Sequence, residues 1–307
     1  MKRVLLTGAD GYIGRSAQQA LIARGYEVHA ISRKPKTSTD TITWHQADLF
    51  DPAAVDNVIS NYGGSHLIHL AWVTEPGAYW QSADNDRWRD ASLALLRSFS
   101  AHGGERAVLA GTCAEYDWSY GHCIEESTPL IARSPYTEAK LAFREAALEF
   151  SRTSGIDLAW ARVFFSFGPY EHPARLVSAV VIALLRGERA QCSDGQQVRD
   201  FMYVRDLAAA FAAVLDSTFC GDINIASGEA ISIKDLVTRI AVQMGADDRL
   251  DFGARPRQAG EPDRITADIS RLTKIVGFTS KTKLETAISE TIAWWRGQVS
   301  NQIPDGA

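Results

Sequence analysis

The chain has 307 residues, which is enough for one large α/β domain or for a large and a small one. Apolar residues make up 46% and charged residues 22%, the range of ordinary globular proteins. The net charge is −5 and no basic stripe is present that could neutralise phosphates, so we expect no nucleic-acid partner.

The cysteines and the apolar runs bear on location. The four cysteines are scattered with no CxxC pair and no metal-ligand spacing, which favours reduced thiols in a cytoplasmic protein without a metal. The apolar run at residues 4–6 stops at Thr7-Gly8, short of the roughly 7 residues of a signal-peptide core. The run at 176–185 is shorter than the ~20 residues that span a bilayer. We therefore expect a soluble protein with no membrane partner.

The first two thirds of the chain alternates short apolar runs with helical patterns. The runs predict strands at 4–7, 28–31, 67–71, 107–110 and 158–164, with a further strand before Asp48. The helical patterns fall at about 13–25, 52–61, 84–101 and 137–153. Continuous apolar strands that alternate with amphipathic helices indicate right-handed βαβ units and a doubly wound α/β fold with a parallel sheet.

The rhythm changes after Gly168-Pro169. The pattern predicts helices at about 174–187, 205–216, 232–245 and 283–297, a strand at 222–225, and loops at 193–198 and 255–264. We expect a smaller α/β domain over the carboxyl edge of the sheet. The predicted division gives residues 1–165 to a nucleotide-binding domain, to which 201–227 returns, and residues 166–200 and 228–307 to a substrate domain.

A glycine motif follows the first predicted strand and opens the first helix. Gly8, Gly11 and Gly14 supply the tight turn, the close backbone approach and the helix packing that a pyrophosphate site needs. The helix N-terminus adds free N–H groups and a positive dipole end. The Gly-x-x-Gly-x-x-Gly spacing resembles that of the short-chain dehydrogenases/reductases, so we expect a Rossmann-type dinucleotide site.

The end of the second strand bears on the choice of cofactor. An NAD site places a carboxylate there to hold the ribose 2′-hydroxyl. This chain instead has Ser32, Arg33 and Lys34, and two cations suit a 2′-phosphate. We therefore predict NADP(H), with NAD(H) as the alternative.

Three residues form a candidate catalytic group. Tyr136 and Lys140 are four residues apart and point from one face of a helix, 24 residues beyond Thr112. A lysine cation about 4 Å from a phenol, at an effective dielectric of ~20, is worth roughly 4 kcal/mol, or about three pKa units. We expect Lys140 to bring Tyr136 close to a working pH for general acid–base catalysis.

Together these residues resemble the extended short-chain dehydrogenase/reductase superfamily of nucleotide-sugar epimerases, dehydratases and reductases. Further similar segments are Arg162-Val163-Phe164 before Gly168-Pro169, the run 198–206 and the run 224–228. The resemblance covers almost the whole chain. It implies a nucleotide-sugar substrate, and a homodimer built through the helices at 84–101 and 135–153.

The resemblance also implies site residues beyond the motifs. The implied cofactor contacts are Gly8, Gly11, Tyr12, Ile13, Gly14, Ser32, Arg33, Lys34, Asp48, Leu49, Leu70, Ala71, Tyr136, Lys140 and Val163. The implied substrate contacts are Thr112, Cys113, Phe165, Arg175, Leu176, Arg199 and Arg257. Arg199 matches the arginine that holds the sugar-nucleotide diphosphate in the family. A second arginine comes from the late loop, where Arg257 and Arg264 both fit, while Phe165 stands where relatives often carry asparagine.

The residues after Thr112 distinguish the possible reactions. Dehydratases of the family place Asp and Glu directly after the threonine, but this chain has Cys113 and Ala114, which excludes dehydration. Glu115 comes one residue later and would point elsewhere on an extended strand, as a turn or supporting carboxylate.

The cofactor prediction favours net reduction. We expect an NADPH-dependent reductase of a nucleotide-linked 4-keto-6-deoxyhexose, in which Tyr136 protonates the C4 oxygen and Thr112 polarises the carbonyl. The segments 168–173 and 196–201 resemble those of deoxysugar 4-ketoreductases. The alternative is a nucleotide-sugar 4-epimerase that recycles its cofactor. A silent NADP(H) sensor and a dihydroflavonol-type ketone reductase are weaker candidates.

Three tryptophans follow the strand predicted at 67–71. Trp72, Trp80 and Trp88 either form a wall of the sugar pocket or belong to the core.

Overall fold

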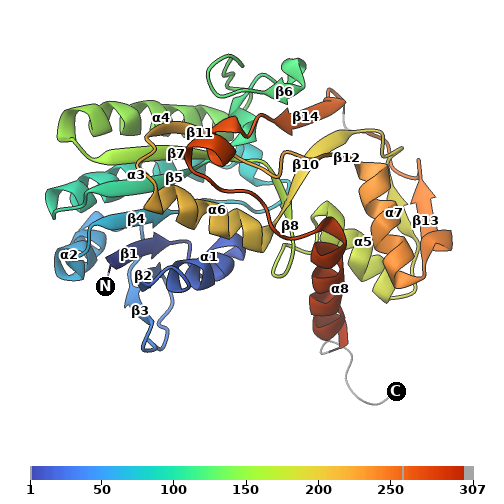
Figure 1. Cartoon of the computed structure of the whole chain (residues 1–307), viewed down its shortest axis with the longest axis horizontal. Coiled ribbons are helices and arrows are strands. Elements are labelled where there is room, and N and C mark those ends of the chain that lie inside the picture. Colours follow the sequence, from blue (N-terminus) through green and yellow to red (C-terminus); the bar gives the residue numbers. More distant parts are fainter. Residues whose placement is uncertain (1, 258, 301–307) are drawn as a thin grey trace.

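A seven-stranded parallel sheet forms the larger part of the molecule (Figure 1). The computed structural model describes residues 2–257 and 259–300. The strands run in the order β11-β7-β5-β4-β1-β2-β3. Their bounds are β1 (Lys2–Thr7), β2 (Tyr26–Ser32), β3 (Ile42–Gln46), β4 (His66–His69), β5 (Arg106–Thr112), β7 (Asp157–Val163) and β11 (Gly221–Ile225). This sheet confirms the predicted α/β class, with the Rossmann-type alternation of strand and helix.

Helices cover both faces of this sheet, as Figure 1 shows. On one face α1 (Tyr12–Ile22) packs against α6 (Val204–Asp216), and their apolar side chains share a core with the sheet. On the other face lie α2 (Pro52–Tyr62), α3 (Asp84–Ala101) and α4 (Pro135–Ser154). Both faces of the strands are buried, which explains their continuous apolar runs.

Local signals fix where the helices on the second face begin. The Asp51 carboxylate accepts the N–H groups of Ala53 and Ala54 and caps α2, while Ser134 caps α4 and Pro135 occupies its first position. The Ser134 cap matters for the site, because it fixes the first turn of α4, which carries Tyr136.

The strand order reverses at β1, whose neighbours are β2 on one side and β4 on the other. In an open α/β sheet such a reversal leaves a crevice outside the carboxyl ends of the strands. The residues at these ends are Thr7 of β1, Ser32 of β2 and His69 of β4. The predicted cofactor contacts therefore gather along one edge of the sheet.

A second group of short strands and three helices lies beyond that edge (Figure 1). One sheet has the order β12-β10-β14-β6 with β8 added to β10, and β9 pairs with β13. The strands are β6 (His122–Cys123), β8 (Phe165–Phe167), β9 (Ala190–Cys192), β10 (Val198–Tyr203), β12 (Ala230–Ser232), β13 (Leu250–Phe252) and β14 (Arg264–Ala267). The helices are α5 (Leu176–Leu185), α7 (Ile233–Met244) and α8 (Leu284–Ser300). Neither β10 nor the other short strands were predicted from the sequence.

No described helix is long and apolar enough to cross a membrane. All four cysteines are free thiols, as the sequence predicts. Within residues 2–257 and 259–300, no cluster of three or more His, Cys, Asp or Glu side chains is placed to hold a metal ion.

Candidate active site

The glycine turn after β1 packs tightly against the end of β4. A Cβ on Gly14 would lie 2.0 Å from the Gly8 carbonyl oxygen, so no side chain fits there. Gly8 has φ +68°, and a Cβ on it would lie 2.9 Å from the Ala71 nitrogen. The turn thus brings Gly8 together with Leu70 and Ala71, three of the predicted cofactor contacts.

The N-terminus of α1 is open to an anion. Gly11 occupies the cap position and no side chain caps the helix, so its first N–H groups remain available. Tyr12 and Ile13 in the first turn pack into the apolar clusters on either side of this turn. The uncapped terminus and the glycine cradle together fit the pyrophosphate of a dinucleotide.

The end of β2 presents both signs of charge. Arg33 and Lys34 are exposed there, as expected for a 2′-phosphate site. The structure adds a carboxylate from the glycine turn, since Asp10 Oδ2 lies 3.3 Å from Ser32 Oγ and 3.4 Å from Lys36 Nζ. A carboxylate at this point suits the ribose hydroxyls of NAD, and the sequence alone did not place Asp10 there.

The two predicted adenine contacts follow β3. Asp48 is exposed and its carboxylate accepts the N–H of Phe50, while Leu49 is buried. A buried leucine beside an exposed carboxylate leaves one apolar and one polar surface at this end of the sheet.

The catalytic candidates meet at the end of β5. Thr112 is the last residue of β5 and is paired in register with Val163 of β7, another predicted cofactor contact. Tyr136 and Lys140 project from the first turns of α4, and both are buried. Lys140 Nζ donates to the Ala110 carbonyl at 3.0 Å and lies 3.7 Å from the centroid of the Trp72 ring. All three residues therefore belong to one site.

Burial dominates the environment of both Tyr136 and Lys140. Burial raises the pKa of Tyr136 above its ordinary value, and a hydrogen-bonding contribution from Thr112 opposes this. Burial lowers the pKa of Lys140 to about 7, and the Glu115 carboxylate opposes that shift. Lys140 is itself desolvated over Trp72, and its effect on the pKa of Tyr136 stays a prediction.

Aromatic side chains cover Tyr136. The ring centroids of Tyr79 and Trp80 lie 4.9 and 5.5 Å from that of Tyr136, both edge-on, and Trp72 lies at 6.5 Å. The amide of Asn85 donates to the carbonyls of Tyr79 and Ser82, which holds this loop in place. Trp88 packs on Trp72 at 6.2 Å, away from the phenol. The sequence analysis missed Tyr79, although it lies in an aromatic-rich loop directly after β4.

Three of the predicted substrate contacts gather between β8 and β10. The Arg199 guanidinium lies 5.5 Å from the Phe165 ring, and Phe165 packs in one apolar cluster with Cys113. Arg199 donates to Glu261 at 2.9 Å, an acidic partner that the sequence analysis did not find.

The late loop contributes one of its two candidate arginines. Asp263 touches both Arg199 and Arg257, through its carbonyl at 3.5 Å and its carboxylate at 2.7 Å. Arg264 instead contacts Thr266 at 3.4 Å. The structure therefore brings Arg257, rather than Arg264, together with Arg199.

The remaining predicted substrate contacts lie at the start of α5. Arg175 occupies the cap position and its guanidinium lies 5.6 Å from the Tyr79 ring, while Leu176 packs in the same apolar cluster as Tyr12. These contacts connect Tyr79, one of the aromatic residues that cover Tyr136, with the start of α5.

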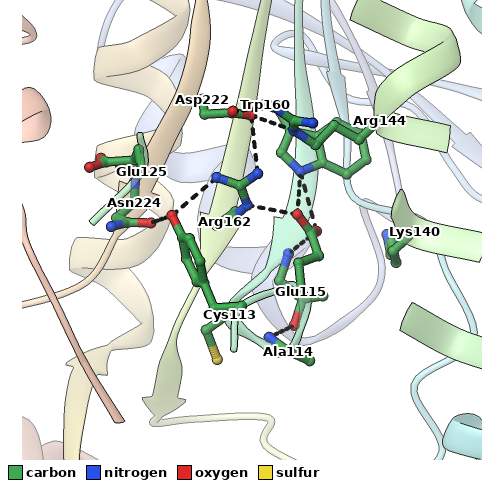
Figure 2. Close-up of polar contacts among 12 residues, drawn as sticks. Cys113, Ala114, Glu115, Glu125, Lys140, Arg144, Trp160, Arg162, Asp222 and Asn224 are labelled. Atoms are coloured by element: carbon green, nitrogen blue, oxygen red, sulfur yellow. Dashed lines mark hydrogen bonds and ion pairs between the residues drawn. The ribbon is translucent and has the colours of Figure 1, made fainter. Parts of the chain in front are cut away.

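Glu115 does not lie on an extended strand. After Thr112 the chain forms a single 3₁₀ turn (Cys113–Glu115), and this turn carries the carboxylate back beneath β5. Figure 2 shows Glu115 facing Trp160 and Arg162. The expectation of an extended strand was wrong, while a supporting role remains, since the carboxylate accepts the Thr112 N–H at 2.8 Å.

Comparisons with known proteins identify the family of the chain. Residues 4–226 match the NAD dependent epimerase/dehydratase family. UDP-glucose 4-epimerase from Corynebacterium glutamicum is 26% identical over 95% of this chain and 94% of its own. The solved UDP-N-acetylglucosamine 4-epimerase from Methanobrevibacter ruminantium M1, in complex with UDP-N-acetylmuramic acid, has a TM-score of 0.85 and 25% identity, over 97% of this chain and 99% of that one. MoeE5, solved with UDP-glucose and NAD, has a TM-score of 0.82 and 28% identity over the same shares, 97% and 99%.

The family match covers the glycine turn, Thr112, Tyr136 and Lys140, on which the resemblance to extended short-chain dehydrogenases/reductases was based. The chain therefore belongs to the NAD dependent epimerase/dehydratase family.

Proposed function

We propose that this protein is a nucleotide-sugar 4-epimerase that works with NAD(H). The observation that carries the proposal is the meeting of Thr112, Tyr136 and Lys140 at the sheet edge that also holds the glycine turn. Two of the relatives, from Corynebacterium and Methanobrevibacter, are 4-epimerases. This choice departs from net reduction, which the sequence favoured on Ser32, Arg33 and Lys34 and on the resemblance of the segments 168–173 and 196–201 to those of 4-ketoreductases.

The residues after Thr112 argue against dehydration. Elimination of water from C5 and C6 of a sugar needs an acid and a base beside the reacting carbons. Ala114 offers only a methyl group, and the Glu115 carboxylate is already engaged with the Thr112 N–H, Trp160 and Arg162. The remaining catalytic candidates, Thr112, Tyr136 and Lys140, suit oxidation and reduction at one hydroxyl-bearing carbon of the sugar.

The chain's own residues would handle the proton. NAD held at the glycine turn would supply the hydride chemistry at C4 of the sugar, with removal from one face and return to the other. Tyr136 takes the proton of the C4 hydroxyl as the hydride leaves and gives it back when the hydride returns, so the net balance is zero. Thr112 hydrogen-bonds the same oxygen, and the Lys140 cation stabilises the Tyr136 phenolate that accepts this proton.

The fit of a dinucleotide depends on features of the turn. The uncapped N-terminus of α1 suits the pyrophosphate, and Gly8 and Gly14, which leave no room for a side chain, allow the close packing that forms this turn. Asp10 at the end of β2 supports NAD over NADP, as does the NAD bound by MoeE5. Arg199 and Arg257 would exchange their present carboxylate partners for the substrate diphosphate.

Net reduction of a 4-keto sugar by NADPH is the second candidate. The observation that favours it is the pair of exposed cations, Arg33 and Lys34, beside Ser32. The two candidates differ in whether cofactor is consumed.

One assay separates the two candidates. We expect purified protein to interconvert UDP-glucose and UDP-galactose, or their N-acetyl forms, without added cofactor, as read by NMR. Tyr136→Phe should lower this rate by at least about 100-fold. NADPH oxidation with a nucleotide 4-keto-6-deoxyhexose, with no interconversion of intact sugars, would replace the epimerase proposal by the reductase.

A further inference from the structure

Glu115 is a buried carboxylate with an unusually complete set of donors. Its side chain is 0% exposed, as is that of Arg162. Its oxygens accept from the Thr112 N–H at 2.8 Å, from Trp160 Nε1 at 3.0 Å and from Arg162 Nε at 2.7 Å. The proposed reaction uses none of these atoms, so their purpose is a separate question.

Fold stability alone is a weak reason for this arrangement. Taking two charges out of water costs several kcal/mol per ion, and apolar side chains of similar volume often stabilise a core equally well. Arg162 needs further partners to remain buried, since it also donates to Tyr116 Oη at 3.0 Å and lies 3.4 Å from Asp222 (Figure 2). A charge kept at this cost beside an active site suggests a role in that site.

Glu115 holds the backbone of Thr112. The carboxylate accepts the Thr112 N–H, while the Thr112 hydroxyl accepts the Ala114 N–H at 3.2 Å, so the two side chains close one turn reciprocally. Because that hydroxyl accepts from the turn, its own proton stays free to bond an oxygen in front of it.

Glu115 also places a negative charge near Lys140. A Cβ on Gly111 would lie 2.9 Å from Glu115 Oε1, and the carbonyl of the preceding residue, Ala110, accepts from Lys140 Nζ at 3.0 Å. The other groups around the Lys140 ammonium are the Ala110 carbonyl, the Trp72 ring and His69, and the Tyr136 ring packs against Trp72 at 6.5 Å. Burial and the Lys140 charge lower the pKa of His69 to about 3, so the imidazole is neutral at pH 7. Burial lowers the pKa of Lys140 to about 7, and the Glu115 carboxylate acts in the opposite direction.

We propose that Glu115 is a positioning residue, which fixes Thr112 at the end of β5 and keeps the buried Lys140 protonated near neutral pH. It touches neither substrate nor cofactor and acts through these two residues. The inference rests on the roles given to Thr112 and Lys140 in the proposed function.

The direct test titrates Lys140 in the protein without substrate. Lysine labelled at ¹³Cε gives one NMR signal per side chain, and the ring current of Trp72 separates that of Lys140 from those of the exposed lysines. Lys140→Arg assigns the signal by its disappearance. We expect Glu115→Gln to lower the pKa of Lys140 by at least about one unit, a tenfold fall in its proton affinity.

Two further variants make the test robust. Glu115→Gln with Arg162→Met removes both charges of the buried pair, and it carries the test if the single variant does not fold. Asp222→Asn is the matched control, because it neutralises another carboxylate around Arg162 without touching Thr112. An unchanged Lys140 titration in both Glu115 variants, or an equal shift in Asp222→Asn, would overturn the proposal.

Turnover provides the second readout. In Glu115→Gln we expect kcat to fall about tenfold at pH 8 with little change in KM, and the loss to shrink as the pH is lowered and Lys140 regains its proton. A uniform loss at every pH would indicate a merely structural role and contradict the proposal. The NMR titration needs no turnover, so a protein that shows the Lys140 shift but epimerises no nucleotide sugar disproves the proposed function and not the Glu115–Lys140 coupling.

Discussion

Two buried glutamates lie next to the candidate site, and they differ in what surrounds their carboxyl groups. Glu115, beneath the end of β5, faces the Arg162 guanidinium, an indole N–H and a backbone N–H. Glu171, in the turn between β8 and α5, accepts from the Ser178 hydroxyl at 2.6 Å, and that hydroxyl in turn accepts from Trp295 Nε1 at 3.2 Å. A cation bonds directly to the carboxylate of Glu115, whereas the direct partner of Glu171 is a hydroxyl and the Arg175 cation acts on it only from a distance.

This difference decides how far the burial of each carboxyl group is compensated. Burial raises the pKa of Glu171 to about 7, and the hydrogen bond from Ser178 only partly opposes it. A hydroxyl dipole does not replace the water that an ionised carboxylate loses, whereas a guanidinium at 2.7 Å compensates the charge of Glu115. The fold thus contains a compensated carboxylate under Thr112 and a proton-binding carboxyl next to Tyr12, whose pKa Glu171 helps to raise.

The largest effect should come from breaking the compensated pair. Arg162→Met leaves Glu115 buried without its cation, and we expect the free energy of unfolding to fall by about 3–5 kcal/mol. Urea denaturation at pH 7.5 measures this loss. Adding Glu115→Gln to the same chain should recover most of it, because no uncompensated charge then remains. A double variant as unstable as the single one would show that Arg162 acts through packing and not through charge.

The second effect depends on pH and concerns Glu171. Its ordinary pKa is 4.5 and its pKa in the folded protein is about 7, so the folded state binds the proton more tightly. The stability that this carboxyl contributes is complete below pH 4.5 and is lost as the pH rises through 7. A shift of this size corresponds to about 3 kcal/mol. Relative to the parent chain, Glu171→Gln should therefore gain about 3 kcal/mol between pH 4.5 and pH 8.

Unfolding curves at several pH values measure this pH dependence of the free energy of unfolding. Glu188→Gln serves as the control, since Glu188 is exposed beyond the other end of α5 and should leave the pH dependence unchanged. A parent chain and a Glu171→Gln variant with parallel pH profiles would mean that Glu171 is charged in the folded state, and the contrast with Glu115 would disappear.

The sequence predicted the large sheet and its helices better than the surroundings of these two carboxyl groups. Apolar runs and helical periodicity report burial of whole elements, and the Gly8 and Tyr136 motifs lie directly on such elements. The direction of Glu115 depends on one 3₁₀ turn after Thr112, which the strand pattern does not contain. Its partner Arg162 is 47 residues away and is brought close only by the pairing of β5 with β7.

The second unit was harder to predict for a related reason. Its strands β6, β8, β9 and β12 have two or three residues each, too few to show an alternating pattern. The same limit applies to Tyr79, whose place over Tyr136 is set by the hydrogen bonds of Asn85 to the loop backbone. Contacts of this kind depend on tertiary structure and leave no periodic signal.

The smallest effect should come from Tyr12, and it tests whether the Tyr12 hydroxyl interacts with the Glu171 carboxyl group. Tyr12 Oη is buried and makes no hydrogen bond of good geometry among the described residues, and only the weak interaction with the Ser166 side chain offsets the desolvation cost of its hydroxyl. Tyr12→Phe should therefore stabilise the protein by about 1 kcal/mol at pH 5, measured by thermal unfolding. At pH 8, where Glu171 is ionised, the phenol could turn toward the carboxylate, and the gain should shrink. A loss of stability at both pH values would mean that the Tyr12 hydroxyl already donates to Glu171. The phenol would then compensate the Glu171 carboxyl group, as Arg162 compensates Glu115.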